Sequence, residues 1–86
     1  MNWTVEYEPE AVVNMEKMTV VMRERIAQKI EWLAENLDQI IPQQLTGNLA
    51  GYYKLRVGDY RVIYDLINEE KVLIISQVGH RSEIYG

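Results

Sequence analysis

The sequence predicts a single α+β domain, in which an antiparallel sheet of about four strands carries two helices on one face. Three observations lead to this prediction. Residues 3–7 alternate apolar and polar side chains, residues 9–37 carry apolar side chains at helical spacing, and residues 51–78 contain three segments rich in Val, Ile and Tyr. A chain of 86 residues has room for one domain, so the expected order across residues 1–86 is β-α-α-β-β-β.

The N-terminal segment predicts a strand followed by a helix. Residues 3–7 have the period-two pattern of a half-buried strand. Pro9 suits the first turn of a helix, because the N–H that proline lacks would have no partner there. We expect this helix to run to about Met18. Its expected apolar contacts are Val12, Val13 and either Met15 or Met18.

A second, longer helix is predicted from one continuous apolar stripe. Thr19 can cap its N-terminus. The stripe has intervals of four, four, three and four residues, which keeps its members on one side of a helix. Its members are Met22, Ile26, Ile30, Leu33 and Leu37. Pro42 ends the helical region, and residues 43–48 are expected to form a connecting loop.

Three strands are expected after this loop, over residues 51–57, 60–67 and 71–78. Gly58 and Asp59 separate the first two, and Gly at the first central position suits a two-residue type II′ hairpin turn. With that turn Arg56 lies opposite Arg61, and Lys54 lies opposite Ile63.

Alternation then sorts the hairpin side chains onto two faces. The face expected to pack against the helices holds Tyr53, Leu55, Val57, Tyr60, Val62 and Tyr64. The other face holds Lys54, Arg56, Arg61, Ile63 and Asp65. Two arginines directly opposite each other repel by a few tenths of a kcal/mol to about 1 kcal/mol. One interpretation is a solvated face neutralised by Asp59 or Asp65, and the other is an anion site in which a phosphate relieves the repulsion.

The charge of the chain is distributed unevenly. The formal net charge is −4, with 9 basic and 13 acidic residues, which argues against nucleic-acid binding over the whole surface. Residues 1–45 carry four basic and eight acidic side chains, whereas residues 46–86 carry five of each. The deficit therefore lies entirely in the first half, away from the hairpin.

The last segment places three further candidate residues just past the third strand of the meander. His80 is a candidate for proton transfer near neutral pH, Arg81 can bind a phosphate with two bonds, and Tyr85 can stack on a base or accept a proton. Ordinary alternatives exist, namely a surface histidine and a packing tyrosine. The register of the second hairpin is ambiguous, so the sequence does not establish whether this segment bends onto the cationic face.

Several classes of protein are excluded by composition. The chain has no cysteine and one histidine, which excludes disulfides and a Cys/His zinc site, and no cofactor is expected. No apolar run is long enough to span a membrane, and the acidic N-terminus does not have the pattern of a signal peptide. We therefore expect a cytoplasmic protein.

The same residues carry a family resemblance that covers nearly the whole chain. Residues 45–64, with the run YYKLRVGDYRVIY, and residues 78–85, with the run VGHRSEIY, resemble the RelE/ParE toxin superfamily, and most of all its RelE branch. The resemblance implies a ribosome-dependent endoribonuclease that cleaves mRNA by attack of the nucleotide's own 2′-OH on the adjacent phosphate, without a metal.

The resemblance also implies roles for individual residues. Lys54 and Arg56 would bind and orient the RNA backbone. Arg61 would stabilise the transition state, Arg81 would contact phosphate or support proton transfer, and Tyr85 would stack on the base or share in activating the 2′-OH. His80 is a further candidate acid or base.

The implied partners are the ribosome with its mRNA and a small cognate antitoxin protein, with DNA contacted only through the antitoxin. Two other functions remain open at this point. One is a ParE-like inhibitor of DNA gyrase, which has no need of the cationic set. The other is a catalytically weakened toxin that only binds its antitoxin, which the acidic balance makes conceivable.

Overall fold

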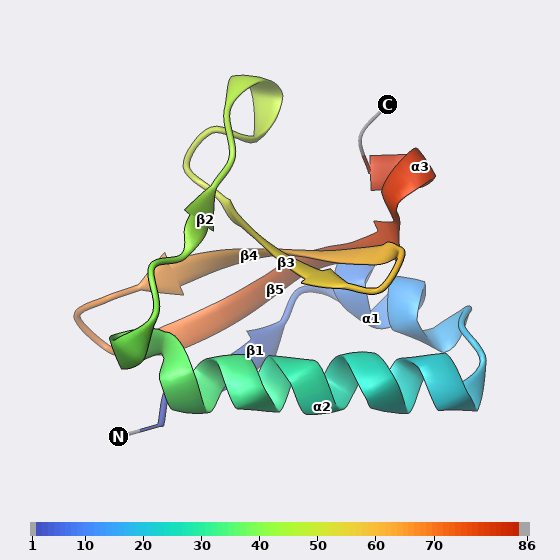
Figure 1. The fold of residues 1–86 in the computed structure, drawn as a ribbon, viewed down its shortest axis with the longest axis horizontal. Helices are drawn as coiled ribbons and strands as arrows, with labels where there is room; N and C mark the ends of the chain where they lie inside the picture. Colours follow the sequence, from blue (N-terminus) through green and yellow to red (C-terminus); the bar gives the residue numbers. More distant parts are fainter. Residues whose placement is uncertain (1, 85–86) are drawn as a thin grey trace.

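A five-stranded sheet forms the middle of the molecule, and helices α1 and α2 cover one of its faces (Figure 1). The computed structural model describes residues 2–84. The elements in chain order are β1 Thr4–Tyr7, α1 Pro9–Glu16, α2 Val20–Asn36, the 3-10 turn η1 Leu37–Gln39, β2 Gln43–Gln44, the 3-10 turn η2 Gly47–Leu49, β3 Tyr53–Val57, β4 Tyr60–Ile67, β5 Val72–His80 and α3 Arg81–Ile84.

The predicted α+β class and the order β-α-α-β-β-β are confirmed, and the structure adds two details. The strands lie in the order β1-β5-β4-β3-β2. β1 pairs with β5 in parallel, so the sheet is mixed, whereas the other pairs are antiparallel. The fifth strand, β2, consists of two residues from the segment that the sequence assigned to a loop.

Helix α1 packs through only some of the residues predicted for it. Val12 and Val13 are 41% and 46% exposed, so the prediction that they contact the core is wrong. Met15 is buried as predicted, and Met18 is half-buried against the core. Ala11 is buried together with Met15, although it was not predicted. These two residues are four apart and therefore lie on the same side of the helix, one turn from each other. The helix contacts β5 through this narrow side, which leaves both valines at the surface.

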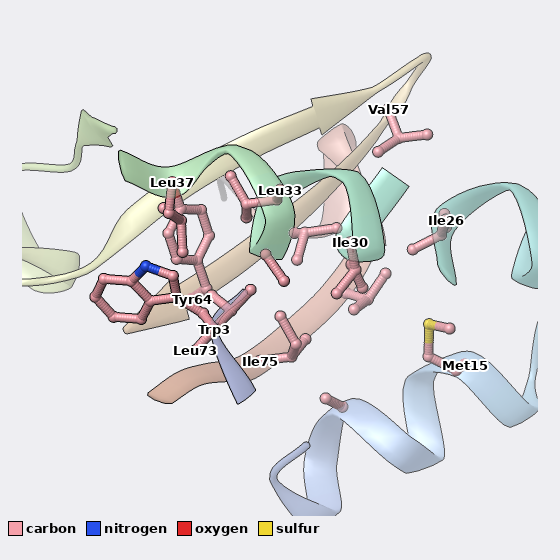
Figure 2. Close-up of a cluster of buried hydrophobic side chains, with 14 residues drawn as sticks. Trp3, Met15, Ile26, Ile30, Leu33, Leu37, Val57, Tyr64, Leu73 and Ile75 are labelled. Atoms are coloured by element: carbon pink, nitrogen blue, oxygen red, sulfur yellow. The ribbon is translucent and has the colours of Figure 1, made fainter. Parts of the chain in front are cut away.

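Helix α2 matches its prediction in both its cap and its buried stripe. The Thr19 hydroxyl accepts a hydrogen bond of 3.2 Å from the Met22 backbone N–H, which satisfies one of the unpaired donors at the helix N-terminus. Four members of the predicted stripe are buried, and Met22 is half-buried at the edge of the core. Figure 2 shows Ile26, Ile30 and Leu33 pointing from α2 toward the side chains of the sheet.

The core lies between these helices and one face of the sheet. Figure 2 shows Tyr64, Leu73 and Ile75 from β4 and β5 beneath α2, with Met15 approaching from α1. The Tyr64 ring stacks on the Tyr53 ring, with 5.6 Å between their centroids. None of the helices within residues 2–84 is both long and apolar enough to cross a membrane.

A β-bulge at Ser76 interrupts the pairing of β4 with β5. Ile63 lies opposite Gln77 while Tyr64 lies opposite Ile75, so Ser76 is an extra residue on β5. Its hydroxyl donates a hydrogen bond of 2.8 Å to Glu8 Oε1. Because side chains alternate along a strand, one extra residue moves every later side chain of β5 to the opposite face.

Candidate functional site

A tight turn sets the register of the β3–β4 hairpin. Gly58 has φ of +60°, while Asp59 does not have positive φ, as a type II′ turn requires. The observed register pairs Val57 with Tyr60 and Arg56 with Arg61, and it continues in step to the end of β3. The predicted register of this hairpin is therefore confirmed at all five pairs.

The hairpin presents Lys54, Arg56 and Arg61 on the face of the sheet opposite the helices. Arg56 and Arg61 are direct cross-strand neighbours, and Lys54 lies one row further along β3. Arg56 is exposed, whereas Lys54 and Arg61 are half-buried. We call this surface the open face, because α1 and α2 cover the other side of the sheet (Figure 1). The next position in the Arg56–Arg61 row is Gly79 on β5, which adds no side chain.

The two carbonyl groups of the turn bind two of the candidate arginines. Arg56 Nε donates a hydrogen bond of 3.1 Å to the Gly58 carbonyl oxygen. The backbone N–H of Arg81 donates a bond of 2.9 Å to the Asp59 carbonyl oxygen. The turn therefore orients the Arg56 guanidinium and also attaches the first residue of α3 to the end of the hairpin.

His80 lies on the helix-covered face of the sheet rather than on the open face. It is the cross-strand neighbour of Tyr60, and the two rings meet edge to face with centroids 5.7 Å apart. His80 Nδ1 accepts the backbone N–H of Ser82 at 3.2 Å and lies 2.9 Å from Ser82 Oγ. A backbone N–H can only donate, so Nδ1 carries no proton in this arrangement and Nε2 carries the ring proton of the neutral imidazole.

His80 also marks the start of α3 through its backbone. Its N–H donates to Glu83 Oε1 at 3.2 Å, three residues further on. Together with the bond from Ser82 to the imidazole, this is the reciprocal pattern of a capping box, with a histidine at the cap position. His80 therefore has a structural role at the start of the helix that carries Arg81.

The structure brings some of the predicted site residues together and leaves one undescribed. Lys54, Arg56 and Arg61 share the open face, and Arg81 begins α3 beside their turn. Figure 1 shows α3 and the η2 segment rising from the side of the sheet opposite α2, at different ends of the open face. Tyr85 lies outside the described residues.

A cavity of about 280 Å³ adjoins the open face and was not predicted. Its lining includes Ile63, which is only 1% exposed although it belongs to the open face, and Gln77, its neighbour on β5. The remaining lining residues are Glu8, Glu10, Asn48, Leu49, Tyr52 and Ser76. Nothing in the sequence pattern indicates this cavity, because residues 43–48 are expected to form only a connecting loop and residues 51–57 only a strand.

The acidic residues near the hairpin do not neutralise Arg56. Within residues 2–84, an ion pair joins Lys71 to Asp38 at 3.2 Å, and neither Asp59 nor Asp65 lies within ion-pair distance of Arg56. Asp65 Oδ1 instead accepts the N–H of Leu66 at 2.8 Å. Over the same residues, no cluster of His, Cys, Asp or Glu side chains could hold a metal ion.

The chemistry available to this arrangement is anion binding. Guanidinium groups present several donors in a plane that matches the oxygens of a phosphate, and fixed cations stabilise charge that develops in a transition state. A phosphate between Arg56 and Arg61 would relieve the repulsion of that pair. The open face can therefore bind a phosphodiester and stabilise extra negative charge on it.

Comparison with known families finds a match over nearly the whole chain. Residues 5–85 match the family model of the ParE toxin of the type II toxin–antitoxin system parDE. The mRNA interferase toxin RelE of Escherichia coli K12 is 30% identical, and the alignment covers 100% of this chain and 93% of RelE.

Solved structures of related toxins share the fold. A mutant of E. coli RelE in the free state superposes with a TM-score of 0.78 at 26% identity, covering 99% of this chain and 92% of RelE. The RelE chain of an archaeal RelE–RelB complex from Pyrococcus horikoshii gives a TM-score of 0.74 at 25% identity, covering 96% of this chain and 99% of that one.

Proposed function

This chain belongs to the RelE/ParE toxin superfamily of type II toxin–antitoxin systems, and we propose that it is a toxin that cuts mRNA on the ribosome. The observation that carries this proposal is the Arg56–Arg61 pair, which lies with Lys54 on the open face of the sheet. A protein that acted only by covering a partner with apolar surface would gain nothing from two opposed arginines, which cost folding free energy.

The proposed reaction is transesterification within the RNA. The 2′-oxygen forms a bond to the adjacent phosphorus while the bond from phosphorus to the 5′-oxygen breaks. A base takes the proton of the 2′-OH and an acid gives a proton to the departing 5′-oxygen. The products are a 2′,3′-cyclic phosphate and a 5′-hydroxyl, and this chemistry needs no metal ion.

Each cation has a proposed part in this reaction. Lys54 and Arg56 hold the RNA backbone, and the bond from Arg56 Nε to the turn directs that guanidinium. Arg61 stabilises the doubly charged phosphorane, the species in which the phosphate carries the most charge. Its half-buried position favours this role, because electrostatic interactions strengthen where water is excluded.

The C-terminal residues have the remaining proposed parts. Arg81 contacts a phosphate oxygen or supports proton transfer, and Tyr85 stacks on a base or takes part in activating the 2′-OH. His80 can exchange a proton only through Nε2, because Nδ1 accepts the Ser82 N–H.

The proposed partners follow from the family. We expect a small antitoxin protein to bind this chain and block it. The Pyrococcus horikoshii relative was crystallised with its RelB partner. The ribosome with its mRNA is the proposed target in the cytoplasm, and any contact with DNA is made through the antitoxin.

Induced expression in a bacterial host tests the proposal. The host carries two copies of one reporter mRNA that differ only in the start codon, so that one is translated and the other is not. We expect growth to stop and primer extension to map cuts within the translated copy alone. Normal growth and intact reporter mRNA in cells that contain folded protein would falsify the proposal, and Arg61→Ala serves as the inactive control.

Inhibition of DNA gyrase is the second candidate function, because the matching family model is that of ParE. The same cells distinguish the two functions. Loss of negative supercoiling in a resident plasmid, with both reporter mRNAs intact, would support gyrase inhibition. Unchanged supercoiling with a cut reporter supports mRNA cleavage.

A further inference from the structure

A groove on the outer side of β3 separates the hairpin from helix α2. Its volume is about 430 Å³. Helix α2 contributes Arg25, Gln28, Lys29 and Trp32, and the hairpin contributes Arg56, Val57 and Gly58. The groove therefore lies around the edge of the sheet from the open face, and Arg56 belongs to both surfaces.

The charged residues of α2 are separated onto different sides of the helix. Arg25, Lys29 and Trp32 follow one another at intervals of four and three residues and face the groove. Glu24, Glu31 and Glu35 form another stripe, at intervals of seven and four residues. Glu31 and Glu35 line a separate cavity beside β1, and the Glu31 carboxylate adds to burial in raising the pKa of Tyr7 on that strand.

The cations of the groove are held close to one another. The Arg25 guanidinium lies against Gly58, where Nη2 would be 3.5 Å from a Cβ added to that glycine. The Arg56 guanidinium is bound to the carbonyl of the same glycine. Lys29 Nζ lies 4.1 Å from the centroid of the Trp32 ring, a cation–π contact that fixes the ammonium in the groove.

No acidic side chain offsets this charge within the groove. Its lining, taken over the described part of the chain, contains three cations and neither Asp nor Glu. The ion pair between Lys71 and Asp38 lies elsewhere in the molecule. A row of cations therefore runs from Arg61 on the open face through Arg56 and Arg25 to Lys29, in a protein whose net charge is −4.

We propose that the α2–β3 groove binds the phosphodiester backbone of the RNA strand as that strand leaves the open face. The shared residue Arg56 makes the two surfaces continuous, and its guanidinium and that of Arg25 both lie at Gly58. The proposal rests on the proposed function, because it extends the strand that would be cut. It explains how an acidic chain can bind RNA, since the strand meets the cationic side of α2 and not its acidic side.

A matched pair of single substitutions on the same helix tests the proposal. Arg25→Ala removes a groove cation, whereas Arg23→Ala removes the same side chain two residues away, outside the groove lining, with the same change in net charge. The probe is a short single-stranded 2′-O-methyl oligoribonucleotide, which cannot be cut because its 2′-oxygen is blocked. Affinity is measured by fluorescence anisotropy over a series of salt concentrations.

We expect Arg25→Ala to weaken binding and to make the negative slope of the logarithm of the association constant against the logarithm of the salt concentration shallower by about 0.7–1. Arg23→Ala should leave this slope near that of the wild type. The double variant with Arg25→Ala and Lys29→Ala should reduce the magnitude of the slope by about twice as much. Equal effects of Arg23→Ala and Arg25→Ala would mean that net charge alone matters and would overturn the proposal. So would a loss confined to ribosome binding with the oligonucleotide unaffected, or binding of an acidic protein segment in place of RNA.

Tryptophan fluorescence gives a second measurement at the groove itself. The chain has two tryptophans, Trp32 in the groove and the buried Trp3, which donates a hydrogen bond to Asp38. Bound oligonucleotide should quench the fluorescence of the wild type, and Trp32→Phe should remove this quenching. Unchanged quenching in Trp32→Phe would overturn the proposal.

These binding measurements are independent of cleavage. If the wild type binds the probe through Arg25 but cuts no mRNA, RNA binding in the groove is supported and the proposed function is contradicted. If the wild type cuts mRNA while Arg25→Ala and Arg23→Ala bind the probe equally well, the proposed function is supported and RNA binding in the groove is contradicted.

Discussion

The two faces of the β3–β4 hairpin are built from alternating residues of the same strands, yet one face is buried against the helices and the other is not covered by them. Val57, Val62 and Tyr64 point toward the helices and are buried. Arg56 and Arg61 point to the open face, where α1 and α2 do not cover them. Neighbours in sequence such as Arg61 and Val62 therefore belong to different surfaces.

This difference separates folding from the proposed chemistry. The covered face stabilises the domain by removing apolar surface from water. The open face lowers that stability slightly, because two directly opposed arginines repel each other, and a bound anion would relieve this repulsion. Substitutions on the two faces should consequently change different measurements.

The largest effect is expected on the open face. Arg61→Ala should slow mRNA cleavage by at least about 100-fold, the loss typical of removing one donor to a charged transition state. The free energy of unfolding should change by less than about 1 kcal/mol, since one partner of a repulsive pair is lost. The cleavage rate on programmed ribosomes and urea unfolding check the two halves of this prediction. A fall of several kcal/mol in the free energy of unfolding of Arg61→Ala would show that the open face also stabilises the fold, and would contradict this prediction.

The covered face should show the opposite pattern. Ile30 is fully buried under the sheet, so Ile30→Ala should lower the free energy of unfolding by roughly 2–5 kcal/mol. Val20→Ala, at a position 56% exposed on the same helix, should change it by less than about 0.5 kcal/mol. Cleavage per folded molecule should be unchanged in both variants. A loss of cleavage by folded Ile30→Ala would show that the covered face also contributes to cleavage, and would contradict the separation of the two faces.

Alkaline pH should act on the covered face. Burial, with a smaller contribution from Tyr53, raises the pKa of Tyr64 from its ordinary value of 10.0 to about 12. A raised pKa stabilises the fold below pH 10 and loses that contribution as pH rises toward 12, because the unfolded state releases its proton first. The loss should reach roughly 2–3 kcal/mol. Tyr64→Phe should show a smaller loss over this range, and identical pH profiles would contradict the assignment.

The smallest predicted effect concerns the cap of α3. Asn can replace the imidazole as a helix cap but Ala cannot, so His80→Ala should destabilise α3 by about 1 kcal/mol more than His80→Asn. Hydrogen exchange of the Ser82 amide measures this difference. Both variants should slow cleavage, because neither side chain can transfer a proton. Cleavage by His80→Asn at the rate of the wild type would rule out proton transfer by His80, and its role would then be to cap α3.

The hairpin and the C-terminal segment also differ in how far the sequence could predict them. Alternation and a two-residue turn determine which hairpin side chains meet, so Arg56 and Arg61 could be paired from the sequence. His80 could not be placed, because the bulge at Ser76 transfers the later side chains of β5 to the other face. Nothing in the local pattern marks that extra residue, which bonds to the distant Glu8.

Tertiary contacts also explain what the sequence missed elsewhere. Val12 and Val13 are as apolar as buried residues, and only the docking of α1 on β5 buries Ala11 beside the predicted Met15 and leaves both valines at the surface. The groove of Arg25 and Lys29 requires α2 to lie beside β3, a placement that the helical stripe alone does not give. Charge spacing on α2 could have suggested it, since the acidic and basic residues already occupy separate stripes.

The most direct test of the account is the chemistry of the RNA ends. Purified protein is added to ribosomes programmed with a defined mRNA, either unmodified or carrying 2′-deoxy substitution at the cut nucleotide. We predict a 5′ fragment ending in a 2′,3′-cyclic phosphate, a 3′ fragment beginning with a 5′-hydroxyl, and no cleavage of the deoxy-substituted mRNA. Cleavage of the deoxy-substituted mRNA, or no cleavage of either mRNA by folded protein, would contradict the account.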